Sequence, residues 1–352
     1  MTLDEAARWL VWYMSYADSS ARSPHSPGKW FSRDTFASAG TNVYPIGRNM
    51  FETIMLNSVL LEDGIRVYSC VNPAWEREPS IVVEDKPYGD SYPRNIPELY
   101  TQQSRRVCLI TDEKNVTSIY IAAGDQYGSE SAFVEPMFLW DVDKKNNMIQ
   151  RPMTIATSSR WRNIQKVLLS APSSRALKWI HILQDYNLIS DWNVPFVMTS
   201  ITYGTQRCVI DKLLSDSISV NSSFFRDDRK TREMHVIIDI INNLSRQFYL
   251  LGKNLSKAEN ADEGHSMIRA NAIQFMFQDV AENLFAQYLN GNIENRVLFK
   301  KIEKQGLAIV EKEMEKEDIS GFMTFSDEAM TAVKAENIFR SEFFKILPRE
   351  EG

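Results

Sequence analysis

The stretch that decides the fold is PFVMTSITYGTQRCVIDKLLSDS, residues 195–217. Residues 196–202 are apolar, β-branched or small hydroxyl residues, which is typical of a strand, and residues 207–214 form a second run of this kind. The glycine between them, Gly204, predicts a tight turn because glycine adopts positive φ values without steric cost. A short polar turn lies at the surface. We therefore expect an exposed hairpin tip carrying Gln206 beside the cation Arg207, either as plain architecture or as a functional element.

The composition is that of an ordinary soluble globular protein. The chain has 352 residues, of which 43% are apolar and 24% charged, so it is long enough for two domains. Its longest wholly apolar run, residues 9–14, is too short to span a bilayer, and the start lacks the pattern of a signal peptide. Three widely spaced cysteines (Cys70, Cys108, Cys208) indicate reduced thiols rather than disulfides or a CxxC zinc site. We expect a cytoplasmic protein with no membrane contact.

Positive charge is concentrated in one segment of a chain whose net charge is −6. Residues 144–178 contain no acidic residue and eight basic ones: Lys144, Lys145, Arg151, Arg160, Arg162, Lys166, Arg175 and Lys178. A local positive field on a mildly acidic body is typical of a surface that contacts phosphates. A solvated basic face without a ligand is the alternative. From charge alone, we select Arg160, Arg162 and Lys166 as candidate phosphate contacts.

The first part of the chain mixes helical and extended patterns. Helices are expected at residues 4–17, 50–61, 159–169 and 174–186, and strands at 65–71, 106–111 and 116–123. Residues 19–47 are dense in Ser, Pro, Gly and Asn, and no period is visible there, which predicts a functional loop or disorder. Because consecutive strands are joined by short loops, we expect an α+β domain with short antiparallel strands over residues 1–222.

From about residue 224 the pattern becomes entirely helical. Helices are expected at residues 228–257, 264–290, 294–316 and 326–347. Short connections between long helices predict antiparallel neighbours, so residues 223–352 are expected to form an all-α four-helix bundle. The first of these helices presents one apolar face: Met234, Ile237, Ile238, Ile241, Leu244, Phe248, Leu251 and Leu255. For the second, the predicted face is Ile268, Ala272, Phe275, Met276, Val280 and Leu284.

Motifs of common catalytic sites are absent from the sequence. It contains no GxxxxGK[ST], HExxH or GxSxG motif, and its four histidines lack the spacing of metal ligands. His181 and Asp185 are four residues apart on a predicted helix, which favours a surface pair over a catalytic dyad. The acidic residues Glu313, Glu315, Glu317 and Asp318 are expected to be solvated at a helix end. We predict no enzymatic activity, no cofactor and no metal.

The sequence resembles the CasA family, the large subunit of the type I-E CRISPR surveillance complex Cascade, along essentially its whole length. The resemblance is carried by an ordered set of segments: AARWL (residues 6–10), FETIMLN (51–57), PAWE (73–76), LYTQQSRR (99–106), EPM (135–137) and YGTQ (203–206). It implies an N-terminal recognition domain followed by a helical bundle. Because members of the family begin further upstream, it also implies that the N-terminal portion of that domain is missing.

The resemblance implies an RNA-guided DNA-binding subunit without catalytic activity. Its implied partners are target double-stranded DNA, the subunits of Cascade that hold the CRISPR RNA, and a helicase-nuclease recruited to the complex. Guide pairing reads the target sequence, while the protein reads the short flanking motif, the PAM, and helps to open the duplex. In this family a glutamine-bearing loop enters the duplex as a wedge, which maps onto Thr205 and Gln206, with Gly204 in the turn. A glycine loop that contacts the minor groove maps onto Gly28 and Lys29.

Two other classes of function stay open on the sequence alone. The bundle of an interaction scaffold would bind proteins, and its basic segment would have no direct role on DNA. An enzyme with an unrecognised site is the third class. A neighbouring CRISPR array and Cascade genes would favour the first class over both.

Overall fold

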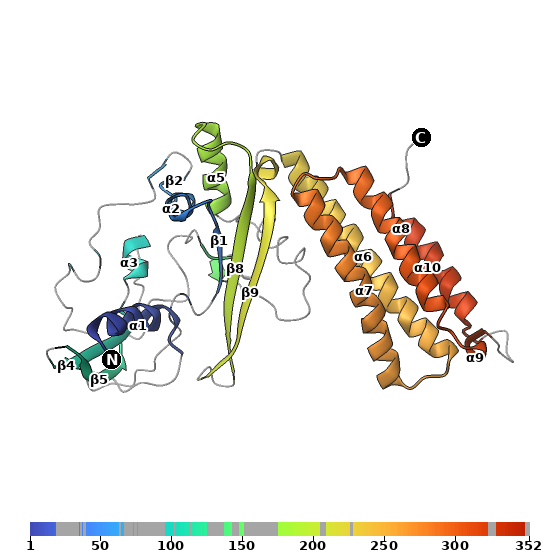
Figure 1. Ribbon diagram of the computed structural model, residues 1–352, viewed down its shortest axis with the longest axis horizontal. Coiled ribbons are helices and arrows are strands. Elements are labelled where there is room, and N and C mark those ends of the chain that lie inside the picture. The colour runs from blue at the N-terminus through green and yellow to red at the C-terminus, as the bar shows by residue number, and fades with distance from the viewer. Residues whose placement is uncertain are drawn as a thin grey trace. The chain divides into compact units, whose positions relative to one another are not determined.

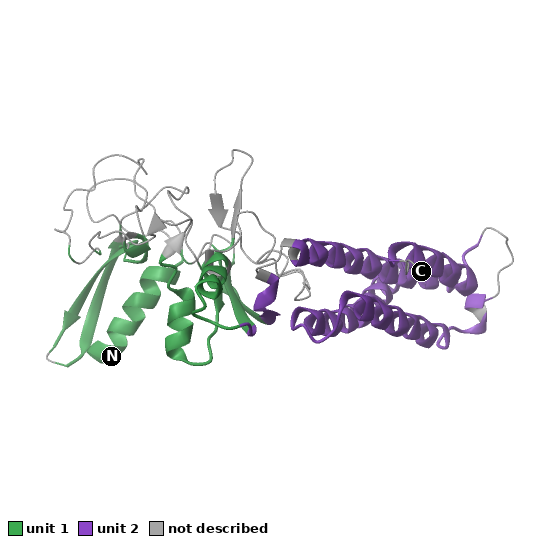
Figure 2. Cartoon of the chain, turned by 90° about the horizontal axis from the view of Figure 1, so that it is seen from above, with its two compact units in different colours: residues 1–156, 166–190, 194–217 green, residues 157–165, 191–193, 218–352 purple. Residues whose placement is uncertain are grey.

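A computed structural model describes the chain at residues 1–18, 35, 37, 40–62, 65–66, 73, 76, 96–101, 103–112, 114–124, 137–142, 148–150, 175–204, 209–225, 228–322 and 329–348. The chain divides into two compact units (Figure 2). The first comprises Met1–Ala156, Lys166–Ser190 and Val194–Ser217, and the second comprises Thr157–Gln165, Asp191–Asn193 and Ile218–Gly352. The domain boundary expected after residue 222 stays a prediction.

The first unit combines helices with short strands, as Figure 1 shows. Its helices are α1 (Leu3–Tyr16), α2 (Met50–Asn57), α3 (Ile96–Tyr100) and α5 (Arg175–Asp185). Two-stranded antiparallel sheets are formed by β2 (Leu61–Glu62) with β3 (Ile65–Arg66), β4 (Arg105–Thr111) with β5 (Val116–Ala123), and β6 (Trp140–Val142) with β7 (Met148–Gln150). The predicted α+β class with short antiparallel strands is confirmed.

A three-stranded sheet organises this unit. Its strand order is β1 (Thr41–Pro45), β8 (Asn193–Tyr203) and β9 (Ile210–Asn221), and β1 pairs with β8 antiparallel so that Val43 faces Met198. Alternate residues of β8 are buried, among them Phe196 and Met198, as the two-residue period of a strand requires. The stretch chosen from the sequence thus forms the central strand and one edge strand of this sheet.

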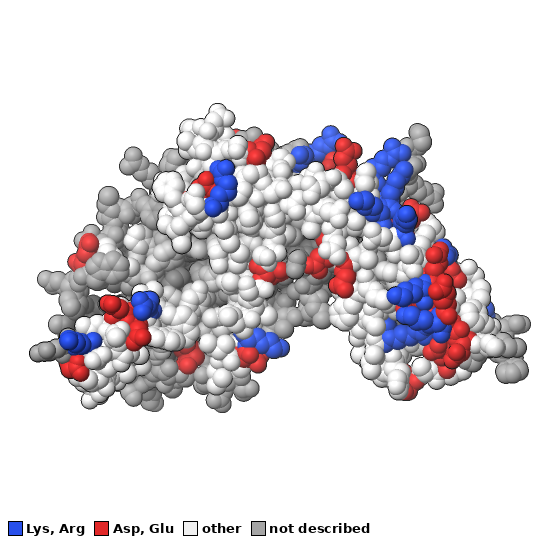
Figure 3. Space-filling model, viewed as in Figure 1, with Lys and Arg blue, Asp and Glu red and all other residues white. Residues whose placement is uncertain are grey.

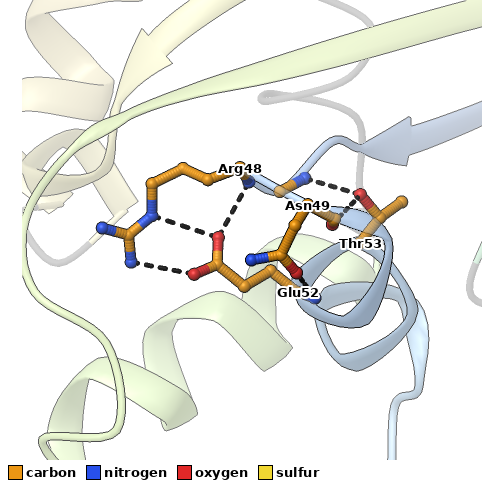
Figure 4. A network of polar contacts seen from close by, with 5 residues as sticks. Arg48, Asn49, Glu52 and Thr53 are labelled. Carbon is orange, nitrogen blue, oxygen red and sulfur yellow. Dashed lines mark hydrogen bonds and ion pairs between the residues drawn. The ribbon is translucent and has the colours of Figure 1, made fainter.

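Helix α2 is fixed by polar contacts at its start, directly after β1 (Figure 4). The Asn49 side chain caps the helix by accepting a hydrogen bond from the Glu52 N–H at 2.9 Å. The Glu52 carboxylate accepts from the Arg48 N–H at 2.8 Å and from Arg48 Nε at 3.1 Å. Hydrogen bonds from the Arg48 side chain, and then from its backbone, lower the pKa of Glu52. Thr53 Oγ1 accepts a hydrogen bond from the Gly47 N–H at 3.0 Å. Two residues of the turn before α2, Gly47 and Arg48, therefore donate their backbone N–H groups to side chains of the helix.

The part of the second unit that follows β9 is the predicted helical bundle. It begins with a short 3-10 helix, Ser222–Phe225, followed by α6 (Asp228–Ala258), α7 (Glu263–Leu289), α8 (Asn295–Met314), α9 (Ile319–Phe322) and α10 (Ala332–Ile346). Helix α6 packs against α7 and α10, and α7 packs against α8. Every residue of the apolar face predicted for the first helix is at most 1% exposed. Among the described helices, none has the length and apolarity needed to cross a bilayer.

The predicted apolar face of α7 is wrong except at Leu284, which is buried. Ile268 is 70% exposed and Phe275 is 39% exposed, whereas Ala270, Ile273 and Phe277 are buried. Apolar residues of α7 lie on several of its faces, so the periodicity of the sequence alone does not indicate which face is buried. The packing partner selects it: the rings of Phe277 and Phe248 stack with centroids 4.3 Å apart.

Several predicted boundaries also need correction. The fourth bundle helix, expected from residue 326, begins at Ala332 after the N-cap Thr331. Residues 41–45, expected to be part of an irregular segment, form β1 because they pair with β8. Helix α2 ends at Asn57 rather than residue 61, and the strand predicted at 65–71 is described only at Ile65–Arg66. The helix predicted at 159–169 lies outside the described residues.

The acidic residues at the end of α8 and directly after it are not all solvated, contrary to prediction. Glu313 is 4% exposed, and the side chain of Glu317 is 0% exposed. Glu313 pairs with Lys316, and Glu317 pairs with Arg269 of α7. The sequence gives no indication of this burial because Arg269 lies 48 residues before Glu317.

Candidate nucleic-acid interface

The β8–β9 hairpin has a wider connection than predicted. Strand β8 ends at Tyr203 and β9 begins at Ile210, so residues 204–209 join them. The Gly204 N–H donates to the Val209 carbonyl at 2.8 Å, which closes the base of the connection. Thr205, Gln206 and Arg207 lie outside the described residues, within this closed connection. Of the residues expected to form the tip, only Gly204 is described.

Gly204 does not play the role predicted for it. Its φ is not positive, and a Cβ atom added to it would lie 3.8 Å from the Val209 carbonyl oxygen, an ordinary contact. The described residues with positive φ are Asn187, Asn260 and Gly291. The conformational freedom of glycine at positive φ is therefore not used at Gly204.

Tyr203, at the end of β8 next to the connection, joins the hairpin to α1. Its hydroxyl donates a hydrogen bond to the Tyr16 carbonyl at 2.7 Å, across 187 residues of sequence. The Tyr16 hydroxyl in turn accepts from Asn42 Nδ2 of β1 at 3.4 Å. The last residue of β8, the last residue of α1 and strand β1 are therefore linked at one place, directly before Gly204.

The backbone carbonyls at the C-terminal end of α1 accept hydrogen bonds from residues distant in the sequence. The last carbonyls of a helix lack partners within it, and α1 has no basic residue in its last turn. Ser104 Oγ donates to the Met14 carbonyl at 3.0 Å, and Thr35 Oγ1 donates to the Ser15 carbonyl. Arg105 is 1% exposed; its guanidinium donates to the Asp18 carbonyl and, at 2.8 Å, to the Ser104 carbonyl. A cation here is favourable because helix C-termini carry partial negative charge.

Sequence reasoning missed these anchoring residues. Ser104 and Arg105 occur in LYTQQSRR, one of the segments that carry the family resemblance, but that pattern did not indicate their role. Their partners are about 90 residues away in the chain, so no local period or spacing reveals the contact.

The hairpin is exposed where β9 leaves the connection. Val209 is 69% exposed and Leu213 is 71% exposed, and Lys212 between them is also exposed. The apolar run predicted as an ordinary strand therefore does not enter the core at this end. Burial begins further along, at Ile218 and Val220. The hairpin thus extends from an anchored base with both apolar and cationic side chains accessible to a ligand.

The other predicted contact residues cannot be placed against the hairpin. Gly28, Lys29, Arg160, Arg162 and Lys166 all lie outside the described residues. Of the basic segment 144–178, Arg175 and Lys178 lie on α5, and Lys178 is exposed. On the face of the molecule in Figure 3, basic and acidic side chains of the bundle lie beside one another. Ion pairs within α10, such as Arg340–Glu336 and Lys345–Glu342, use some of the basic side chains.

The described residues also include the His181–Asp185 pair expected from the sequence. His181 Nδ1 lies 3.5 Å from Asp185 Oδ1, and both side chains are substantially exposed, which is the geometry of a surface pair. Within the part of the chain that is described, no three His, Cys, Asp or Glu residues are arranged to hold a metal ion.

Comparison with known proteins decides the family. The profile of the family described as CRISPR-associated protein Cse1 matches residues 1–314. The chain belongs to this family. CasA and Cse1 are two names for it, so the resemblance to the large subunit of Cascade is confirmed. No curated protein sequence matches the chain significantly.

Solved Cse1 structures share this fold. Thermobifida fusca Cse1 has a TM-score of 0.79 at 21% identity, covering 99% of this chain and 71% of its own length. Acidimicrobium ferrooxidans Cse1 has a TM-score of 0.76 at 20% identity, with coverages of 98% and 73%. A chain of a CRISPR RNA-guided surveillance complex has a TM-score of 0.52 at 14% identity, with coverages of 88% and 68%.

Proposed function

We propose that this Cse1-family chain is the non-catalytic large subunit of an RNA-guided Cascade complex. In this role it recognises the PAM of target double-stranded DNA and opens the duplex beside it to start R-loop formation. It then helps to recruit the helicase-nuclease in antiviral defence. Membership of the Cse1 family is the observation that carries this proposal.

The hairpin supports a mechanical role for Gln206. A residue that enters a duplex must unstack a base step, which costs a few kcal/mol and is offset by groove and phosphate contacts. The loop that carries the wedge residue must therefore be held rigidly by the rest of the protein. The Gly204–Val209 hydrogen bond closes the connection, and the Tyr203–Tyr16 hydrogen bond fastens its base to α1. Gln206 lies between these two closing residues in the sequence.

The chemistry of the tip fits recognition of several flanking motifs. The minor groove distinguishes mainly A·T from G·C pairs, so a subunit that reads it tolerates more than one PAM. Thr205 and Gln206 supply neutral hydrogen-bonding groups, and Arg207 supplies a cation for the adjacent phosphates. We assign Gly28 and Lys29 to the groove, and Arg160, Arg162 and Lys166 to the phosphate backbone.

The test is Gln206→Ala in the assembled complex, with Gln305→Ala as the matched control. Gln305 is an exposed glutamine on α8 of the bundle. We expect Gln206→Ala to weaken binding of PAM-containing duplex about tenfold or more, since a tenfold loss corresponds to about 1.4 kcal/mol. Permanganate reactivity of thymines beside the PAM should fall with it. Duplex binding and opening equal to those of the control would exclude the wedge.

An interaction scaffold is the second candidate, and one feature of the bundle favours it. A groove of about 890 Å³ lies between α6, α8 and α10. Its lining combines apolar residues with polar and charged ones: Val236, Ile240, Phe299 and Phe344, and Asn295, Arg296, Lys300 and Glu303. Val236 is 58% exposed and Phe344 is 43% exposed. In a pure scaffold, substitutions in this groove would disturb assembly, while Gln206→Ala would leave DNA binding unchanged.

A further inference from the structure

A buried charge cluster joins three parts of the bundle. Arg269 of α7 contacts two carboxylates: its Nη1 lies 3.0 Å from Oε2 of Glu259, directly after α6, and its Nη2 pairs with Oε1 of Glu317, between α8 and α9. The side chain of Glu317 is 0% exposed, that of Arg269 is 20% exposed and that of Glu259 is 32% exposed. Water therefore reaches Glu259 more easily than Glu317.

The charges of this cluster do not balance when both carboxylates are ionised. One guanidinium then faces two negative groups. Moreover, Oε2 of Glu317 is buried and has no hydrogen-bond partner within the described part of the chain. A buried oxygen that carries negative charge without a donor is costly, whereas a protonated carboxyl at the same place is neutral.

Helix α9 covers this unpartnered oxygen. A Cβ atom added to Gly321 would lie 2.9 Å from Glu317 Oε2 and 3.8 Å from Glu259 Cγ. The backbone of α9 therefore lies directly on the cluster, and a side chain at Gly321 would require the Glu317 carboxyl to shift. Movement of α9 away from this position would admit water to Oε2.

We propose that Glu317 takes up a proton and works as a latch that holds α9 against the ends of α6 and α7. With the proton on Oε2, the cluster holds one guanidinium and one carboxylate, and α9 covers a neutral group. Loss of the proton leaves an uncompensated negative charge under Gly321, which is relieved when α9 lifts and water enters. This latch is independent of the proposed role on DNA.

The surrounding charges support this assignment. Burial raises the pKa of Glu317; the hydrogen bond and charge of Arg269 lower it, Glu259 raises it again, and the net shift is upward. Neighbouring charged groups have other partners: Lys316 pairs with Glu313, and His265 pairs with Asp262. On the side of α10, Lys334 donates to the Ala329 carbonyl.

The direction of the pH dependence follows from linkage. A carboxyl whose pKa is higher in the closed state than in the open state stabilises the closed state at low pH. That stabilisation is lost as the pH rises from the ordinary glutamate value, about 4.3, through the raised value. One proton changes the opening equilibrium by at most about tenfold per pH unit.

Hydrogen exchange of the full chain between pH 5 and pH 8 tests the latch, after correction for intrinsic exchange rates. For peptides covering residues 317–322, protection in the native chain should fall as the pH rises, by up to about tenfold per unit. Glu317→Gln should hold α9 closed over the whole range, because its amide is neutral and places a donor where Oε2 lies. Glu342→Gln, which removes an exposed partner of Lys345, is the matched control and should behave as the native chain.

A second substitution guards against a local folding defect. Glu259→Gln removes one of the two carboxylates but keeps the Glu317 pair, so an ionised Glu317 is then balanced by Arg269. The loss of protection at high pH should therefore be smaller in this variant than in the native chain. If protection of residues 317–322 is independent of pH in the native chain, the latch is wrong. The same conclusion follows if the native chain and Glu317→Gln show the same pH dependence.

Discussion

At the scale of the residue, the β8–β9 hairpin is held in place by side chains that join distant segments. Tyr203 is the clearest case because its hydroxyl links the last residue of β8 to the end of α1. The sequence marked Gln206 through a family resemblance, but it could not mark Tyr203, whose partner is 187 residues away. For the same reason the sequence did not predict the roles of Thr35, Ser104 and Arg105, which donate hydrogen bonds to backbone carbonyls at the end of α1.

Tyr203→Phe removes this hydroxyl and leaves the Tyr16 carbonyl without its donor. We expect the free energy of unfolding of the first unit to fall by about 1 kcal/mol, the typical net value of one hydrogen bond. Tyr186→Phe is the matched control because Tyr186 is 70% exposed. Urea denaturation followed by fluorescence measures both. Equal midpoints for the two variants would show that the Tyr203 hydroxyl does not fasten the hairpin.

At the scale of the element, prediction succeeded where one face of a helix is clearly apolar. The buried face of α6 was predicted residue by residue, because its apolar residues recur with a single helical period. That of α7 was not, because residues such as Ile268 and Phe275 make its other faces apolar as well. Close approach to α6 determines which face is buried, and that approach is a property of two helices together.

The backbones of α6 and α7 approach each other closely at Gly252. A Cβ atom added there would lie 2.5 Å from the Ala270 Cα, so the two backbones would have to separate. We expect Gly252→Ala to destabilise the bundle by about 1–3 kcal/mol, the usual cost of overpacking. At Gly204 an added Cβ atom would make only an ordinary contact, 3.8 Å from the Val209 carbonyl oxygen, so Gly204→Ala should change stability by less than about 0.5 kcal/mol. Thermal unfolding followed by circular dichroism compares them; equal losses would contradict this account of the α6–α7 contact.

At the scale of the whole molecule, the sequence predicted the class of fold and the family. The order of mixed α/β and helical parts follows from a change of period near residue 224, and both parts are present. Single buried charges were not predictable: Glu317 was expected in solvent because its neighbours are acidic, yet Arg269 and α9 enclose it. Tertiary contacts decide such positions.

The basic segment, residues 144–178, contrasts with the chain as a whole, whose net charge is −6. We propose that this segment contacts DNA phosphates. Reversal of Arg160, Arg162 and Lys166 to Glu should weaken duplex binding for all sequences alike. It should also reduce the slope of log affinity against log salt by about 0.9 for each phosphate that the chain no longer neutralises. Lys114→Glu, at an exposed position of the β4–β5 loop, is the control. An unchanged salt slope with a lower melting temperature would make the segment structural.

The proposed opening of the duplex by Gln206 is tested most directly with a target that is already open beside the PAM. In the assembled complex, Gln206→Ala should bind intact PAM-containing duplex about tenfold or more weakly than the native chain, because the unstacking step is unassisted. On a duplex already mismatched beside the PAM, that cost is absent, so the variant and the native chain should bind with equal affinity. An equal loss of affinity on the intact and the pre-opened duplex would contradict the wedge and leave Gln206 as an ordinary DNA contact.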